Sequence, residues 1–250
     1  MTDDRWDDYL ARFHHDRAGI TEAILGRASG DDGTGPYDWV VEALPPGGVI
    51  VDVACGSAPL ARPVRGWIGF DRSPTELDLA ARVAPGRVCL ADAASAPVRT
   101  GSADAVVCSM ALMLVDDPLR ALVEMRRLLR SGGRLVALLP ATAPLTVRDR
   151  ARYIRLLAAL RLTRLPFRHH PVVDDPASSL AAAGLTAVSA DRRRFCYHLD
   201  GPEDGVRFVR SLYLPGLGPG RLRTARRLTR RWTGSSIGLP LRRLVATREP

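Results

Sequence analysis

The chain has 250 residues, of which 46% are hydrophobic and 25% charged, and this supplies enough apolar material for a sizeable core in one domain. Its net charge is +9. All 36 basic residues are arginines, since the sequence contains no Lys, and it contains no Asn or Gln either. A lysine base and a bidentate amide contact to a nucleic-acid base are therefore excluded. The acidic N-terminus lacks the apolar stretch of a signal peptide, and the longest apolar run, residues 105–115, is too short to cross a bilayer. We therefore expect a cytoplasmic protein that does not insert into a membrane.

The four cysteines have no metal-binding or redox spacing, since no two of them form a CxxC pair. They are Cys55, Cys89, Cys108 and Cys196. Three lie in or just after predicted core strands. We therefore expect buried free thiols in a reducing compartment, and we predict neither a disulfide nor a metal site.

The first 44 residues predict helices that precede a sheet. Trp6, Tyr9, Leu10 and Phe13 follow the i, i+3, i+4, i+7 spacing of one helix face. Such a stripe indicates a side that packs against the rest of the protein.

Three successive predicted strands each end in, or are followed at once by, a carboxylate. They are residues 49–53 with Asp52, residues 67–70 with Asp71, and residues 87–90 with Asp92. The first is an apolar run that breaks into small residues, which is typical of a buried parallel strand running into a tight loop. Ligands of open α/β sheets bind at these carboxyl ends. A row of carboxylates there suits a ligand with an amino group and a ribose diol, since carboxylates accept hydrogen bonds from both.

Helices and strands continue to alternate after the first acid-ended strands. Ser73 is a predicted N-cap for a helix over residues 74–83, and Asp117 caps the helix that follows a fourth strand at 102–107. A fifth buried strand covers residues 135–139. This alternation predicts an α/β fold with a doubly wound, mostly parallel sheet.

The last third of the chain predicts two more strands, which brings the sheet to seven. Residues 185–191 alternate as the sixth strand, and residues 239–246 form the last one. Between them lies a helical insertion, about residues 201–234, where a short hairpin connection is usual. We expect one domain over residues 1–250, made of N-terminal helices (1–45), a core (46–140) and a C-terminal half (141–250).

The acid-ended strands resemble the motifs of class I S-adenosylmethionine-dependent methyltransferases. Residues 49–58 are similar to the first motif, a strand followed by D-x-G-x-G-x-G, and residues 122–138 to the E-x-x-R-x-L-x-P-G-G-x-L motif. The other matches, in the family's order, are residues 67–73, 88–98 and 102–107. The resemblance spans residues 49–140. It implies a Rossmann-like methyltransferase fold with an antiparallel last strand, S-adenosyl-L-methionine as cofactor, and methyl transfer as the activity.

The chain departs from the first motif at its outer two glycines. Ala54 and Ala58 replace them, and only Gly56 remains. Because alanine resists positive φ, we expect the loop to hold both alanines in ordinary backbone regions, with Pro59 making Ala58 extended. The two prolines of the following segment, Pro59 among them, predict a first helix of about two turns.

The resemblance also implies cofactor-binding residues. Asp52 would orient the first-motif loop near the methionine end, Asp71 would accept from both ribose hydroxyls, and Asp92 would take the adenine amino group. The remaining implied contacts are Ala54, Gly56 and Ser57 for the methionine part, Arg72 for the adenine face, Ala93 for the adenine ring, and Ser109 and Met110 for the methionine side.

The acceptor side has candidates but no assigned catalytic residue, since a base is needed only for a weak nucleophile such as a protonated oxygen. Candidate bases are His14, His15, His169 and His170, and candidate lining residues are Tyr9, Tyr37 and Tyr213. By resemblance, the N-terminal helices could cover the cofactor, but plain core packing is the more common reason for such an apolar stripe.

The sequence favours a small-molecule acceptor and leaves two alternatives open. Residues 126–250 carry 25 Arg and 8 acids, against 11 Arg and 19 acids in residues 1–125, and such an arginine-rich half could bind RNA for methylation. The two missing glycines leave room for a non-catalytic protein that binds S-adenosylmethionine. A nicotinamide enzyme is disfavoured, because G-x-G-x-x-G is absent after the first strand.

Overall fold

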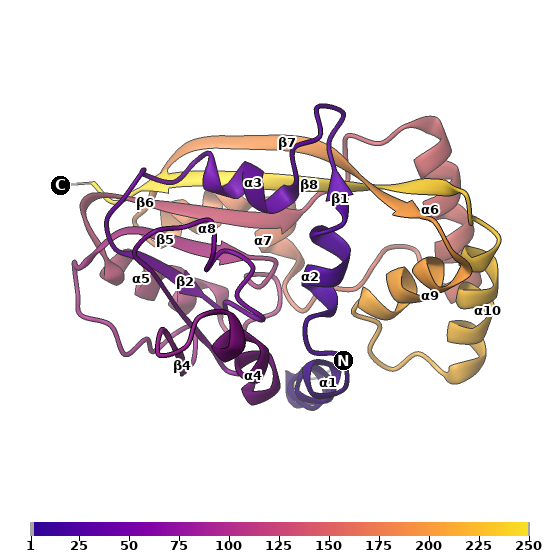
Figure 1. The fold of residues 1–250 in the computed structure, drawn as a ribbon, viewed down its shortest axis with the longest axis horizontal. Coiled ribbons are helices and arrows are strands. Elements are labelled where there is room, and N and C mark those ends of the chain that lie inside the picture. Colours follow the sequence, from indigo (N-terminus) through magenta and orange to yellow (C-terminus); the bar gives the residue numbers. More distant parts are fainter. Residues whose placement is uncertain (1–2, 250) are drawn as a thin grey trace.

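The computed structural model describes residues 3–249, and its centre is one eight-stranded sheet in the order β1-β7-β8-β6-β5-β2-β3-β4 (Figure 1). The strands are β1 (Ala28–Ser29), β2 (Ile50–Val53), β3 (Trp67–Asp71), β4 (Val88–Leu90), β5 (Ala103–Ser109), β6 (Leu129–Pro140), β7 (Thr186–Leu199) and β8 (Ser235–Thr247). Strands β2 to β6 pair in parallel, and β8 runs antiparallel to both of its neighbours. The predicted doubly wound, mostly parallel sheet with an antiparallel last strand is therefore confirmed.

Ten helices surround the sheet within residues 3–249. They are α1 (Asp3–Asp16), α2 (Ile20–Leu25), α3 (Pro36–Val41), α4 (Pro74–Val83), α5 (Pro118–Leu128), α6 (Val147–Leu160), α7 (His170–Asp174), α8 (Pro176–Ala182), α9 (Pro202–Ser211) and α10 (Pro219–Arg230). Helices α6, α9 and α10 gather at one end of the molecule, and α4 and α5 at the other (Figure 1). None of the helices in this range is both long and apolar enough to cross a membrane.

Alternate residues of the central strands feed two separate cores. In β5, Ala105 and Val107 join the cluster under α2, α3, α6, α9 and α10, whereas Val106 and Cys108 join the cluster under α1, α5, α7 and α8. Both faces of the sheet are thus buried, which is why the strands read as continuous apolar runs.

The helix starts follow the predicted caps. The Ser73 side chain accepts a hydrogen bond from the Glu76 amide at the start of α4, and Asp117 does the same for the Arg120 amide at the start of α5. In both helices proline occupies the first turn, where no amide donor is missed.

The sheet has one strand more than the seven predicted. The two residues of β1 pair with β7 at Ala28↔Tyr197 and Ser29↔Cys196, in a segment expected to be helix and loop. A strand of two residues has no alternating pattern, so the sequence carried no signal for it. β7 also runs on through Tyr197 to Leu199, where it supplies this extra partner.

Two predictions for the loop after β2 are wrong. Ala54 has φ +55° and Ala58 has φ +62°, both left-handed, alongside Gly56 at φ +54°. No helix separates β2 from β3, and the chain crosses residues 54–66 in turns. The left-handed positions let the loop fold back on β3, where the Cys55 amide donates to the Phe70 carbonyl at 3.0 Å. A left-handed backbone costs a non-glycine residue about 1–2 kcal/mol, and tertiary hydrogen bonds of this kind outweigh that cost.

The prediction that the cysteines are free thiols agrees with the structure, whereas the prediction that they are buried is partly wrong. All four cysteines are free, but Cys89 is exposed and Cys196 is only half-buried. Cys89 lies on β4, the edge strand, whose neighbouring residue Leu90 is also exposed.

Replacing Ala58, which has a left-handed backbone, by glycine should lower the free energy of unfolding less than replacing an alanine with an ordinary backbone. Ala58 and Ala61 are both fully buried in the same loop, and only Ala58 has positive φ. Ala58→Gly loses a methyl group but removes about 1–2 kcal/mol of strain, so we expect its free energy of unfolding to stay within about 0.5 kcal/mol of the unmodified protein. Ala61→Gly should lose about 1–2 kcal/mol. Urea denaturation measures both, and equal losses would contradict the account of the loop.

Candidate functional site

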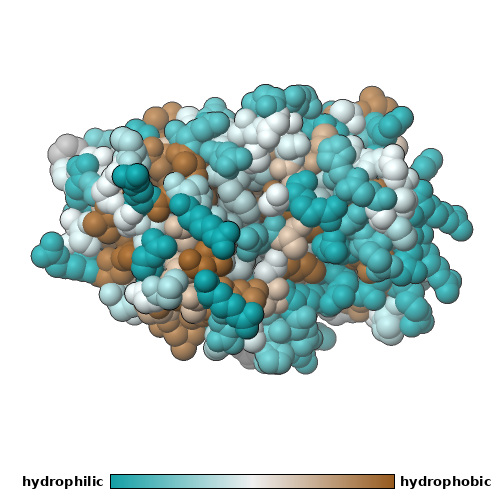
Figure 2. Space-filling view, viewed as in Figure 1, coloured by the Kyte–Doolittle hydropathy of each residue, from teal (hydrophilic) through white to brown (hydrophobic). Residues whose placement is uncertain are grey.

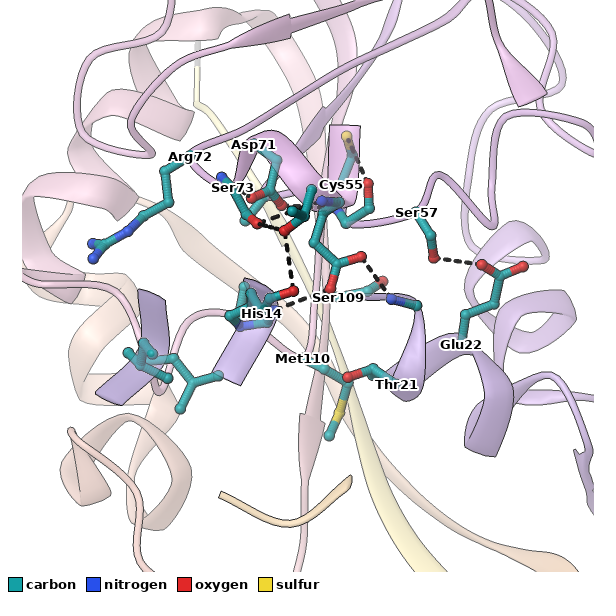
Figure 3. Close-up of a pocket in the computed structure, with 18 of the residues that line it drawn as sticks. His14, Thr21, Glu22, Cys55, Ser57, Asp71, Arg72, Ser73, Ser109 and Met110 are labelled. Atoms are coloured by element: carbon teal, nitrogen blue, oxygen red, sulfur yellow. Dashed lines mark hydrogen bonds and ion pairs between the residues drawn. The ribbon is translucent and has the colours of Figure 1, made fainter. Parts of the chain in front are cut away.

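The carboxyl ends of β2, β3 and β5 border a cavity of about 520 Å³ (Figure 3). Helices α1 and α2 border it on one side, and Tyr213, which follows α9, on another. Eight of the ten predicted cofactor residues line it, namely Asp52, Ala54, Gly56, Ser57, Asp71, Arg72, Ser109 and Met110. The sheet topology alone brings these positions together, because neighbouring parallel strands end at the same edge.

Asp71 ends β3 as a buried carboxylate that holds two backbone amides. Its Oδ2 accepts from the Gly56 amide at 2.8 Å, and its Oδ1 accepts from the Ser73 amide at 2.8 Å. Burial raises the pKa of this carboxyl, and the two amide bonds act in the opposite direction. Each oxygen retains a second lone pair, so Asp71 can still accept two hydrogen bonds from a ligand.

Asp52 and Ser109 each bring an unsatisfied polar atom to the cavity wall. The Trp67 indole donates to Asp52 Oδ2 at 3.0 Å, whereas Asp52 Oδ1 and the Ser109 hydroxyl are buried without a partner. Burial raises the pKa of Asp52 to about 7, and the Asp71 charge adds to that rise. An orphaned buried acceptor is costly unless something in the cavity satisfies it.

Two further acids line the cavity and were not predicted. Buried Glu76 bonds His14 Nδ1 at 3.0 Å and accepts from the Gly19 amide at 2.9 Å, so α4 holds both N-terminal helices in place. Glu22 accepts a hydrogen bond from the Ser57 hydroxyl (Figure 3). The Ser73-x-x-Glu76 spacing is that of a capping box, and that signal would have assigned the Glu76 side chain to the helix start instead.

Arg72 points away from the other labelled side chains toward an ion-pair cluster (Figure 3). It bonds Asp116 at 2.7 Å and Asp7 of α1 at 3.2 Å, and Arg168 bonds the same two carboxylates at 2.6 and 2.7 Å. This cluster fastens α1 to the loop before α5 and to the segment before α7. The predicted stripe on α1 is also buried, with Trp6, Leu10 and Phe13 in the core.

Asp92 and Ala93 are the two predicted residues that do not line the cavity. Asp92 Oδ1 instead accepts from the Ala94 amide at 2.8 Å, within its own turn after β4. Ala93 is buried in the core.

The candidate bases are divided between different surroundings. His14 and His15 line the cavity, and the ring of His14 lies 6.1 Å from that of Tyr213. His169 and His170 do not line it: the His170 ring accepts from the Phe167 amide at 3.3 Å, and Nε2 of His169 is buried without a partner. Tyr37 and Tyr213 line the cavity, whereas Tyr9 does not, and its hydroxyl accepts from the Leu214 amide at 2.7 Å.

Several solved structures share this fold. The 4+2 cyclase SpnF aligns at TM-score 0.62 and 17% identity, covering 96% of this chain and 95% of that one. A putative methyltransferase from Bacillus halodurans aligns at TM-score 0.55 and 17% identity, over 86% and 99%. Geranyl diphosphate C-methyltransferase from Streptomyces coelicolor, solved with S-adenosyl-L-homocysteine, aligns at TM-score 0.51 and 16% identity, over 85% and 74%. At these identities the likeness is one of fold.

Residues 51–137, from β2 into β6, match the family model of a methyltransferase domain. This part of the chain is therefore similar to a methyltransferase domain. Comparison with curated proteins found no match. A cyclase is among these structural neighbours, so the shared fold alone does not fix the reaction.

The residues that line the cavity fit S-adenosylmethionine, the cofactor that the sequence resemblance implies. Four carboxyl groups line the cavity (Glu22, Asp52, Asp71 and Glu76), and the cofactor carries a sulfonium and an amino group. The orphaned atoms of Asp52 and Ser109 supply an acceptor and a hydroxyl. A Cβ built on Gly56 would meet only Glu76 Oε2, at 3.8 Å, so the backbone here is open to a ligand.

The raised pKa of Asp52 should appear as a pH dependence of stability. The carboxyl titrates near 3.9 in the unfolded chain and near 7 in the folded one, so the folded protein alone binds this proton between about pH 4 and pH 7. Asp52 therefore lowers the free energy of unfolding progressively as pH rises through that range. Asp52→Asn should remove this loss.

Urea denaturation of both proteins at pH 5, 6, 7 and 8 measures the effect. We expect Asp52→Asn to gain stability relative to the unmodified protein as pH rises. Asp78→Asn, which removes an exposed carboxylate of α4, should show no such trend. A difference between Asp52→Asn and the unmodified protein that stays constant with pH would contradict the raised pKa.

Proposed function

We propose that this protein transfers the methyl group of S-adenosylmethionine to a small-molecule acceptor, with the cofactor in the acid-lined cavity. The observation that carries the proposal is the gathering of Asp52, Asp71 and Ser109 at the ends of three adjacent parallel strands, each with free hydrogen-bonding capacity.

The two acids take different parts of the cofactor. Asp71 accepts from the ribose hydroxyls through the lone pairs that Gly56 and Ser73 leave free. Asp52 and Ser109 receive the amino-acid end, where a cationic amino group favours the ionised form of Asp52 and satisfies its orphaned Oδ1. Ala54, Gly56, Ser57 and Met110 border the same region.

The adenine end of the cofactor lies on the side of the cavity where Arg72 stands. Arg72 lines the cavity beside Asp71, and its pairing with Asp7 and Asp116 fixes it at the cavity wall. Asp92 and Ala93 lie beyond the lining residues, in the turn that follows β4, the next strand outward from β3. Their contact with adenine would require the base to extend along the sheet edge past β3.

The bound cofactor supplies an electrophilic methyl group on a positively charged sulfur. The protein contributes alignment and the exclusion of water. Glu76 holds α1 and the turn before α2 across the cavity through His14 and Gly19, and the ion pairs of Asp7 fasten the other end of α1. The N-terminal helices are thereby the cover that keeps solvent from the reacting atoms.

A small acceptor is favoured over RNA by a structural neighbour that acts on a small molecule. Hydrophilic residues cover the end of the molecule formed by α6, α9 and α10 (Figure 2). Two arginines there pair with acids, Arg230 with Glu203 and Arg207 with Asp204. Among the structural neighbours, geranyl diphosphate C-methyltransferase acts on a small molecule.

The ribose role of Asp71 predicts a loss of cofactor affinity in Asp71→Asn. The amide side chain has one acceptor oxygen instead of two, so it cannot hold both Gly56 and Ser73 and also accept twice from a ligand. Losing a charge-assisted hydrogen bond costs about 1.5–3 kcal/mol, which corresponds to roughly tenfold or more in Kd for S-adenosylmethionine. Isothermal titration calorimetry measures this.

The matched control is Asp78→Asn, which removes the same charge from an exposed position of α4 and should bind as the unmodified protein does. Equal affinities for Asp71→Asn and Asp78→Asn would overturn the ribose role.

A further inference from the structure

A second cavity, of about 370 Å³, lies directly beside the cofactor cavity. Its volume falls within the range of about 300–1,000 Å³ that is usual for small-molecule pockets. The end of β6, α6, the segment before α7, α9 and β8 all contribute to its wall. The two cavities share three lining residues, Thr21, Met110 and Tyr213.

The shared boundary is mostly apolar and carries a single pair of hydroxyl groups. The hydroxyl-bearing side chains of Tyr213 and Thr21 both line this boundary, and burial raises the pKa of Tyr213, so the phenol is neutral. Met110 has φ +58°, and its amide donates to the Leu138 carbonyl at 2.7 Å. Strain of this kind at a cavity wall fixes where a side chain stands. Met110 and Thr21 appear together in Figure 3.

The rest of the second cavity is lined mainly by aliphatic and aromatic side chains, among them Leu157, Leu165, Phe167, Leu212 and Leu239. Such walls favour an apolar ligand, because transfer of apolar surface from water into an apolar cavity lowers the free energy.

The other half-buried polar groups in the wall are already engaged, whereas Thr142 and Thr163 are exposed. The Tyr153 hydroxyl donates to the Gly238 carbonyl at 3.0 Å, and the Ser211 hydroxyl donates to the Phe208 carbonyl at 2.8 Å. Burial lowers the pKa of His170, which keeps its ring neutral.

Formal charge in this wall is confined to one ion pair near solvent. Among the lining residues, all of which lie in the described part of the chain, Arg164 and Asp174 are charged; they pair at 3.5 Å, and each is more than half exposed. A ligand charge placed deeper in the cavity would therefore be desolvated without a partner, which is costly.

We propose that the second cavity binds the methyl acceptor and that this acceptor is a neutral, predominantly apolar small molecule. Its one polar end reaches the Thr21–Tyr213 hydroxyl pair, at the boundary with the cofactor cavity. The proposal rests on the function proposed above, and it adds the chemical class of the acceptor.

Three probes of equal chain length test the class: 1-octanol, octanoate and octylamine, which are neutral, anionic and cationic at pH 7. Each is titrated into the protein with bound S-adenosyl-L-homocysteine and followed by calorimetry. We expect 1-octanol to bind saturably at one site, and the two charged probes to bind at least about tenfold more weakly, because their charge is unpaired in the cavity.

A cavity-filling variant tests the location. Ala141 lines the second cavity and not the first, so Ala141→Phe should weaken 1-octanol binding at least about tenfold and leave the affinity for S-adenosyl-L-homocysteine unchanged. Val188→Phe, at an exposed position of β7, is the matched control and should bind both ligands normally. Thr142→Phe, at an exposed lining position, replaces Ala141→Phe if that variant does not fold.

The outcomes separate the two proposals. Normal binding of S-adenosyl-L-homocysteine with no 1-octanol binding, with equal binding of the charged probes, or with 1-octanol binding that neither cavity-filling variant weakens would overturn the acceptor proposal alone. Failure of the unmodified protein to bind S-adenosyl-L-homocysteine would overturn the function on which it rests.

Discussion

The hydrogen bond from the Gly56 amide to Asp71 is the interaction on which the cofactor cavity depends. It ties the loop after β2 to the end of β3, and together with the bond from the Cys55 amide to the Phe70 carbonyl it fixes a loop that has no helix to hold it. Two alanines adopt left-handed geometry to make this possible. The same carboxylate keeps lone pairs free for a ligand, so one side chain both builds the cavity and faces it.

The cavity is lined by several buried carboxyl groups, and this lining favours a cationic ligand. Burial raises the pKa values of both Asp52 and Asp71, which means that their ionised forms are destabilised in the free protein. A positively charged ligand relieves that cost, because it favours the ionised carboxylates. The N-terminal helices join the cavity through the same kind of group: Glu76 and Glu22 reach from α4 and α2 to His14, Gly19 and Ser57.

The sequence was sufficient to predict the sheet and most of the cavity wall. Periodicity predicts the strands, and parallel topology brings their ends, such as Asp52, Asp71 and Ser109, to the same edge whatever the direction of each side chain. It failed where tertiary contacts overrode local preference. The positive φ of Ala54 and Ala58 contradicts the intrinsic tendency of alanine, and Glu76 leaves the capping role that its spacing predicts. β1 could not be predicted from the sequence, because its two residues form a strand only by pairing with β7. The boundary between the two cavities is formed by Thr21, Met110 and Tyr213, which come from distant segments of the chain. No local sequence pattern could therefore predict this boundary.

The most direct test of the central claim is a crystal structure of the protein with S-adenosyl-L-homocysteine bound. The account predicts the ribose hydroxyls within hydrogen-bond distance of both Asp71 oxygens, and the amino-acid end beside Asp52 Oδ1 and the Ser109 hydroxyl. A ligand bound elsewhere, or a ribose that leaves Asp71 bonded only to Gly56 and Ser73, would contradict it.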